Sequence, residues 1–411
     1  MTIPVLMDGA MQPMLDLAFA SSAAVDGRVS VTRSGTASTY FDAAGVLRTA
    51  AANTPRLDYD PATLAGRGLL IEEARTNLVV NSTTFNSGWT GNGATVNTFV
   101  PITLPDGTFG GYRAIDTGLV GVHEMFQALS HISGTTYTAS LVAKAGSRQW
   151  VTVAFYDGVS AFGAYFDLQN GVIGGSAGGF VAPSSKQMQS LGNGWYRCSI
   201  TATAGATGGN MLFGIASADG TRSFAGSGND YIHVYHAQDE AGAFPTSIIL
   251  SGGSATTRPA DVATLPLASL GFNPARFSAR IDYQRRDGGT SGGRALFAFT
   301  NGSQVSFVNA VQLNTAQVEN STYIGAATGP TASDTAAHKY AFAINSAGTY
   351  QDCQDGGVAV LFGVTGWSAP SITQVNLGTD RISSLFLNGW VRRLKLYAAT
   401  LAGTTLQGMT R

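Results

Sequence analysis

Residues 148–156 alternate strictly between two kinds of side chain. Val151, Val153 and Phe155 fall on one side, and Trp150, Thr152 and Tyr156 fall on the other. Successive side chains of a β-strand point to opposite faces, so this period of two indicates a strand with one buried face. Similar alternation recurs in residues 162–168 and 195–200, and the hairpin signals Asp157-Gly158, Asn170-Gly171 and Asn193-Gly194 separate these segments. The pattern predicts an antiparallel β-sandwich.

The alternation returns after residue 260, which indicates a second sandwich. Phe277, Ala279, Ile281 and Tyr283 alternate with polar residues, whereas residues 251–257 are small and polar and indicate a linker. The first eighty residues hold short apolar runs between turn signals. We therefore expect an all-β chain with a turn-rich β region at 1–80, sandwiches at 81–250 and 260–411, and helix only in short pieces.

The charge content restricts the partners that this chain can have. Only 12% of residues are charged, the formal net charge is −1, and 52 of the 411 residues are glycine. Lysine and arginine do not cluster, so the basic stripe that nucleic-acid binding requires is missing and no nucleic acid is expected. No apolar run of about 18 residues occurs, so we expect no membrane span. The N-terminus lacks the basic start of a signal peptide, which favours synthesis in the cytoplasm, and both cysteines are expected to be reduced.

Several sequence blocks resemble those of a known group of proteins. Residues 33–77, with Thr39-Tyr40-Phe41-Asp42 and Glu72-Glu73-Ala74-Arg75-Thr76-Asn77, resemble a segment common in tail- and head-fibre (spike) proteins of bacteriophages, prophages and gene transfer agents. Residues 192–197 (Gly-Asn-Gly-Trp-Tyr-Arg) and 231–247 are similar to the carbohydrate-binding-module-like jelly roll that follows in those proteins. The C-terminal region looks like a concanavalin/laminin-G-type jelly roll.

This resemblance implies two tandem jelly rolls and a role in virion attachment. The expected function is a non-enzymatic adhesin, a fibre or spike subunit that holds host capsular or surface polysaccharide. We expect a homo-oligomer, located on the virion after synthesis in the host bacterial cytoplasm, with no cofactor. The alternatives are a capsule-degrading glycosidase or esterase of the particle, or a connector without a ligand of its own. Members of this group share no fixed sugar-contacting positions, so the resemblance assigns no site residue.

The candidate carbohydrate-binding residues come from the polar side of the strands in the middle region. Large aromatic rings on a solvent face are uncommon, and such rings stack on the flat C–H faces of sugars while polar groups bind the hydroxyls. The alternative is that this side packs against the first region or a neighbouring subunit, because interfaces are enriched in the same rings. The candidates are Trp150, Tyr156, Tyr165, Asp167, Trp195, Arg197, Tyr231, His233 and Tyr235.

Catalytic and metal-binding sites have weaker support in the sequence. Residues 174–178 match G-x-S-x-G, but a nucleophile elbow needs a preceding strand and a following helix, and this run lies between strands. His233 and His236 would point to opposite faces of a strand and cannot share a metal. Asp352 and Asp355 could help hold calcium, although a solvated turn is the favoured interpretation. Asp157 and Asp167 are carboxylates that sequence cannot place as a catalytic pair. We expect no catalytic residue and no metal.

The first twenty residues are apolar for a chain terminus. They include Ile3, Val5, Leu6, Leu15, Leu17 and Phe19. An exposed apolar segment marks a contact site, so we expect residues near 1–20 to dock onto a capsid, tail or other fibre protein rather than into the protein's own cores. The alternative is an edge strand that closes the first region.

Overall fold

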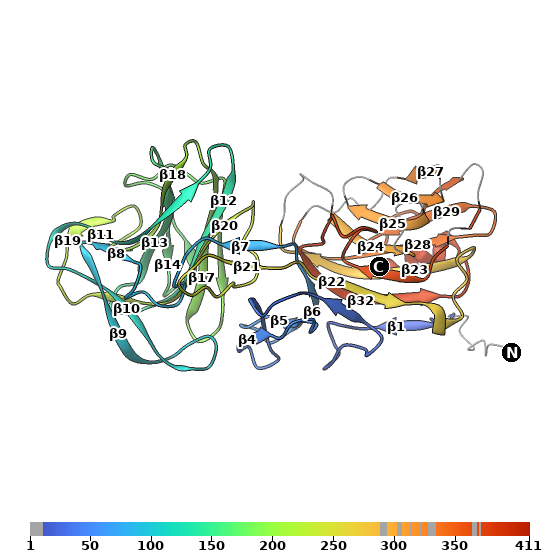
Figure 1. Cartoon of the computed structure of the whole chain (residues 1–411), viewed down its shortest axis with the longest axis horizontal. Coiled ribbons are helices and arrows are strands. Elements are labelled where there is room, and N and C mark those ends of the chain that lie inside the picture. Colours follow the sequence, from blue (N-terminus) through green and yellow to red (C-terminus); the bar gives the residue numbers. More distant parts are fainter. Residues whose placement is uncertain are drawn as a thin grey trace.

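The computed structural model describes residues 11–287, 294–301, 306–312, 315–320, 322–327, 334–363, 368–369 and 371–411. These residues form an all-β protein in which every pairing between named strands is antiparallel, as the alternation predicts. Within the described ranges the regular helices are a short 3-10 turn, η1 (Ala268–Leu270), and a terminal α1 (Gly403–Thr410). Neither helix is long and apolar enough to cross a membrane. Two sandwiches lie end to end (Figure 1).

The central sandwich consists of two sheets. One sheet has the order β16 (Ser185–Ser190), β17 (Trp195–Thr203), β12 (Thr136–Ala145), β20 (Tyr231–Ala241), β10 (Phe109–Asp116) and β9 (Ala94–Thr103). The other has the order β15 (Val172–Ile173), β14 (Ala161–Asp167), β13 (Trp150–Tyr156), β18 (Gly208–Ala216), β11 (Val120–His131) and β19 (Ser223–Ala225), and β8 (Thr90–Asn92) also pairs with β11.

The core of this sandwich confirms the predicted register. Val151, Val153, Phe155, Phe166 and Ile200 are fully buried between the sheets, and Tyr196 packs against the same core while half-buried. Trp150 does not belong to this cluster. A slip of one residue would have turned the polar set inward, so the alternation specified the inner face of each strand correctly. Cys198 and Cys353 are free and buried, as expected.

The C-terminal sandwich takes strands from both ends of the chain. Its first sheet has the order β30 (Val360–Gly363), β29 (Thr349–Gln354), β28 (Ala337–Ile344), β23 (Phe277–Arg285), β32 (Gly389–Tyr397), β6 (Gly66–Ile71) and β5 (Leu57–Tyr59), with β1 (Leu15–Leu17) also on β32. Its second sheet has the order β2 (Ser30–Thr32), β22 (Val262–Pro266), β31 (Gln374–Leu377), β24 (Arg294–Thr300), β25 (Ser306–Gln312), β26 (Thr315–Asn320) and β27 (Thr322–Ala327).

The terminal segment corrects one expectation. Residues 1–10 lie outside the described part, but Leu15, Leu17 and Phe19 are buried in the C-terminal core. β1 pairs with β32, and Asp16 points outward to an ion pair with Arg393. The expectation that this segment docks onto a partner instead of its own core is therefore wrong for residues 11–20. The physical reason is the Leu-Asp-Leu alternation, which suits a half-buried strand.

Two connections join the sandwiches. β7 (Arg75–Asn77) and β21 (Thr256–Arg258) form an antiparallel ribbon between them (Figure 1). The hairpin of β3 (Ser38–Phe41) and β4 (Leu47–Ala50) extends from the C-terminal half, and its Phe41 and Leu47 pack on the central sandwich. The segment predicted as a linker, residues 251–257, therefore ends in a paired strand, because Thr256 and Thr257 belong to β21.

Candidate functional site

The structure divides the nine candidate residues between two different sheets. Trp150 and Tyr156 lie on β13, and Tyr165 and Asp167 lie on the adjacent β14. Trp195 and Arg197 lie on β17, and Tyr231, His233 and Tyr235 lie on β20, all in the opposite sheet of the sandwich. Alternation reports which side of a strand is polar but not which sheet the strand joins. The nine residues therefore do not form one surface.

Trp195, Arg197 and Tyr235 are interior residues of the junction. The two rings are buried with Phe41 and Leu47 from the β3–β4 hairpin, and the Trp195 indole N–H donates to a backbone oxygen. Arg197 is buried and donates to the backbone oxygen of residue 246 at 2.5 Å. These buried side chains cannot stack on a ligand. They fit the alternative interpretation, in which this side of the strands packs against the first region.

Tyr231 and His233 lie at the start of β20, before Tyr235. The guanidinium of Arg113 covers the Tyr231 ring, with its carbon 4.1 Å from the ring centre. Burial, with the charges of Arg113 and Lys144, lowers the pKa of His233 to about 4. His236 is bonded instead to the backbone oxygen of residue 249, so the two histidines do not converge. Among the described residues no group of three or more His, Cys, Asp or Glu could hold a metal ion.

The outer face of the other sheet carries a hollow over Leu212 of β18. Leu212 pairs with Ala154 of β13 on one side and with Phe126 of β11 on the other. Phe126 and Tyr156 are half-buried aromatic residues on this face. The hollow, which we call the sheet trough, has a volume of about 290 Å³ and is lined by Glu124, Phe126, Tyr156, Asn210, Leu212 and Arg222, with Ala161.

One end of the sheet trough is closed by an ion pair. Arg222 lies 2.7 Å from Glu124, donates to the Gly178 oxygen at 2.9 Å, and stacks on Phe180 at 4.4 Å. Burial raises the pKa of Glu124 even though the positive charge of Arg222 opposes that shift. Asn210 adds a side-chain oxygen that is buried and has no hydrogen-bond partner in the described structure. The trough therefore combines two rings with fixed polar groups.

The loop of residues 174–181 explains the G-x-S-x-G match. No helix follows it, and it lies across β14 instead, where Phe180 packs on Tyr165 with 5.8 Å between ring centres. Gly178 has φ +69°, and a Cβ there would lie 2.6 Å from the Tyr165 hydroxyl and 2.4 Å from the backbone oxygen of Gly220. The glycines allow this close approach, and the nucleophile-elbow interpretation has no structural context here.

The remaining carboxylate candidates are bonded to groups of the fold itself. Asp167 is buried and accepts the backbone N–H groups of residues 169 and 170. Asp157 is buried and accepts backbone N–H groups from residues 159, 160, 205 and 206. Asp352 accepts the Tyr340 hydroxyl inside the C-terminal core, and Asp355 contacts His338 in a turn. Each carboxylate has a structural partner.

Sequence reasoning missed six of the seven residues that line the sheet trough, and four of the six have polar or aromatic side chains. Glu124, Phe126, Asn210 and Arg222 come from β11, β18 and the segment before β19. Phe126 shares the outer face of β11 with Glu124, and this alternation was available as a signal. Their approach to Tyr156 depends on pairings between distant strands, which no local pattern reveals.

A second hollow lies between the sandwiches, and we call it the junction cleft. Its volume is about 510 Å³. The N-terminal and C-terminal strands supply Arg67, Trp390 and Arg392, and the central sandwich supplies Gln187 and Gln189 from β16. Arg285, Arg286, Gln284 and Asp60 also line it.

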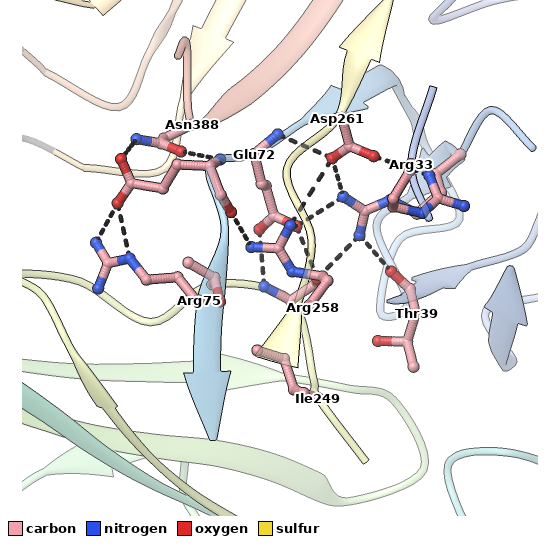
Figure 2. A network of polar contacts seen from close by, with 12 residues as sticks. Arg33, Thr39, Glu72, Arg75, Ile249, Arg258, Asp261 and Asn388 are labelled. Carbon is pink, nitrogen blue, oxygen red and sulfur yellow. Dashed lines mark hydrogen bonds and ion pairs between the residues drawn. The ribbon is translucent and has the colours of Figure 1, made fainter. Parts of the chain in front are cut away.

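A buried ionic network lies beside this cleft (Figure 2). Arg33 donates to Asp261 at 2.8 Å, and Arg56 bridges Asp261 and Glu72. Arg258 lies 3.6 Å from Glu72 and 3.9 Å from Asp261. All five side chains are buried, and the three guanidiniums and two carboxylates pair with one another away from water. The network ties the connection at residues 258–261 to the first region.

Comparisons with known proteins give little. No family model and no curated protein matches the sequence. Part of the chain is similar to the Ruminococcus gnavus IT-sialidase CBM40 bound to α2,3 sialyllactose, at 13% identity over 33% of this chain and 82% of that one, with a TM-score of 0.28. The tandem CBM22 domains of Paenibacillus barcinonensis Xyn10C are similar at 9% identity over 80% and 98% of the chains, with a TM-score of 0.24. Scores this low carry no inference.

Proposed function

We propose that this protein is a non-enzymatic carbohydrate-binding subunit that retains host-surface polysaccharide in the sheet trough. The observation that carries the proposal is the trough itself, where Tyr156 and Phe126 remain half-buried beside the Glu124–Arg222 pair and the unpartnered oxygen of Asn210. Aromatic rings offer a flat apolar face, and the polar groups offer fixed acceptors and donors for hydroxyls.

The placement of this subunit on a fibre or spike of a phage-like particle is also part of the proposal. It is supported by the sequence blocks at 33–77 and 192–197, which resemble those of fibre proteins. A fibre carries several copies, and linked weak sites gain affinity through effective concentration. A shallow trough suits such a multivalent arrangement.

Binding is favoured over cleavage by the carboxylates of the trough lining. Glycoside hydrolysis uses two carboxyl groups about 5–10 Å apart. The lining contributes Glu124, which Arg222 holds in an ion pair, whereas Asp157 and Asp167 accept turn N–H groups elsewhere. A connector without a ligand would not need these half-buried rings beside a hollow.

The test measures binding of short oligosaccharides from host capsule to the purified protein. Tyr156→Ala and Phe126→Ala should each weaken binding about tenfold, because a ring contact contributes ~0.5–1.5 kcal/mol and 1.4 kcal/mol corresponds to a factor of ten. Phe109→Ala is the matched control, since that ring is 67% exposed and lies outside the trough lining.

Two results would contradict the proposal. One is unchanged affinity in both trough variants with the fold intact by circular dichroism. The other is release of shortened saccharides by the wild-type protein, which would indicate an enzyme. Labelling of particles with an antibody against this chain, viewed in negative stain, tests the placement on a fibre or spike separately.

A further inference from the structure

We propose that the junction cleft is a second binding site, and that its ligand is an acidic oligosaccharide carrying carboxylate or sulfate groups. Its lining includes four arginines, Arg67, Arg285, Arg286 and Arg392. The first three are ion-paired with Asp60, Asp287 and Glu72, whereas Arg392 has no carboxylate partner in the described structure. This concentration of arginines stands out in a chain with 12% charged residues and a net charge of −1. The volume of about 510 Å³ lies within the ~300–1,000 Å³ usual for ligand sites.

Trp390 fixes two of these arginines. The guanidinium carbons of Arg67 and Arg286 lie 4.9 and 4.8 Å from the centre of its ring. The Trp390 indole N–H donates to Asp58 at 2.8 Å, and both arginines approach that same carboxylate at 3.9 Å. Arg67 also pairs with Asp60 at 2.7 Å and Arg286 with Glu72 at 3.3 Å, so these two guanidiniums are largely neutralised and the free positive charge at the cleft is that of Arg392. Since the arginines are already held in place, little side-chain entropy is lost when an anion binds.

Arg392 supplies a charge that no carboxylate of the described structure neutralises. Its guanidinium donates weakly to two neutral oxygens, the Gln284 side chain at 3.2 Å and the Arg67 backbone at 3.4 Å. A half-buried guanidinium with neutral partners is suited to bind a carboxylate or sulfate through charge-assisted hydrogen bonds.

The facing wall carries amides instead of charges. Met188 packs into the core of the central sandwich, so its neighbours Gln187 and Gln189 on β16 turn outward to the cleft. Neither amide hydrogen-bonds another side chain or backbone group within the described part of the chain. Amides both donate and accept, which suits sugar hydroxyls. A sugar with an acidic group would use both walls at once.

An acidic saccharide fits this cleft better than a nucleic acid does. Nucleic-acid sites extend along the backbone as a basic stripe, often with aromatic rings exposed for base stacking. The arginines here form one local group, and the cleft's Trp390 is 5% exposed and lies beneath two of them. The site also lies apart from the sheet trough, so the two proposals stand independently.

The experiment uses the full chain and titrates tetragalacturonate, with maltotetraose as the neutral comparison. We expect binding of the uronate alone, and a loss of affinity as ionic strength rises from about 0.05 to 0.5 M, because salt screens such pairs. Arg392→Gln should weaken uronate binding at least about tenfold, the equivalent of 1.4 kcal/mol. Gln187→Glu should weaken it as well by placing a negative charge on the facing wall.

Controls separate this site from the sheet trough. Arg48→Gln removes an arginine whose side chain is 51% exposed outside the cleft, and it should bind uronate as the wild type does. Tyr156→Ala should also retain uronate binding, so failure of one site leaves the other testable. Equal uronate affinity in the wild type, Arg392→Gln and Gln187→Glu would overturn the proposal. Equal binding of maltotetraose, or tighter competing binding of a thymidine tetranucleotide, would overturn it too.

Discussion

Glu72 lies at the centre of the contacts that join the two sandwiches, and replacing it by glutamine is the sharpest test of how they are held together. Its buried carboxylate accepts Arg56 at 2.9 Å and both the backbone N–H and hydroxyl of Ser247 at 2.7 Å. Arg258 and Arg286 approach it at 3.6 and 3.3 Å. Burial alone would raise the pKa of Glu72, but the charges of Arg258, Arg286 and Arg56 hold it well below 4.5.

The expected loss follows from what remains after the substitution. Glu72→Gln keeps the shape but leaves three guanidiniums without a central negative charge. Removing one partner from a buried ion pair lowers the free energy of unfolding by about 3–5 kcal/mol. A carboxylate with a lowered folded pKa stabilises the protein above its unfolded pKa, and that contribution is lost as pH falls through the folded pKa. The difference from wild type should therefore be complete at pH 7 and shrink only below about pH 4.5.

Urea unfolding at pH 7, followed by tryptophan fluorescence and circular dichroism, measures the effect. Because Ser247 lies in the segment that leaves the central sandwich after β20, the variant should also unfold in two separated steps, one for each sandwich. Glu73→Gln is the matched control. Its carboxylate is 30% exposed and pairs with Arg75, so its loss should be at most about 1 kcal/mol. A Glu72→Gln loss no larger than that of Glu73→Gln would refute this account of the junction.

Two further predictions concern the C-terminal sandwich. Leu17→Ala should lower the free energy of unfolding by about 2–5 kcal/mol, because Leu17 is 5% exposed in that core; a loss below about 1 kcal/mol in urea would show that β1 is dispensable. Burial raises the pKa of Asp352 to about 6, so the stabilising contribution of this group is complete below about 3.8 and is lost as pH rises through about 6. Asp352→Asn should therefore melt at a higher temperature than wild type at pH 8 and at the same temperature near pH 3.5, and a pH-independent difference would contradict this.

The alternation of side chains predicted the inner faces of the strands but not their partners. Val151 and Ile200 are core residues because one face of each strand must be buried, and that requirement is local. Trp150 and Trp195 both lie on polar sides, yet they belong to different sheets, which long-range pairing decides. β1 pairs with β32 at the other end of the chain, and an alternation of three residues cannot name that partner.

The buried charges were hidden from sequence analysis for a related reason. Arg33, Arg56 and Arg258 are isolated in the sequence and look like surface residues of a weakly charged protein. They become a cluster only when the first region and the segment after the central sandwich meet, and burial then requires that each be paired. The arginines of the junction cleft converge in the same way.

A rigid connection between the two sandwiches would favour binding of one ligand at both proposed sites. The sheet trough lies on the outer face of the central sandwich, whereas the junction cleft lies where that sandwich meets the C-terminal half. One long polysaccharide that contacts both sites gains from effective concentration only when their separation matches the span of the ligand. The ribbon of β7 and β21, the Phe41–Trp195 packing and the ion pairs of Glu72 limit that separation before any ligand binds. The conformational entropy of orienting the two sandwiches is then lost during folding rather than during attachment, so the two shallow sites together hold a long ligand more tightly than either site does alone.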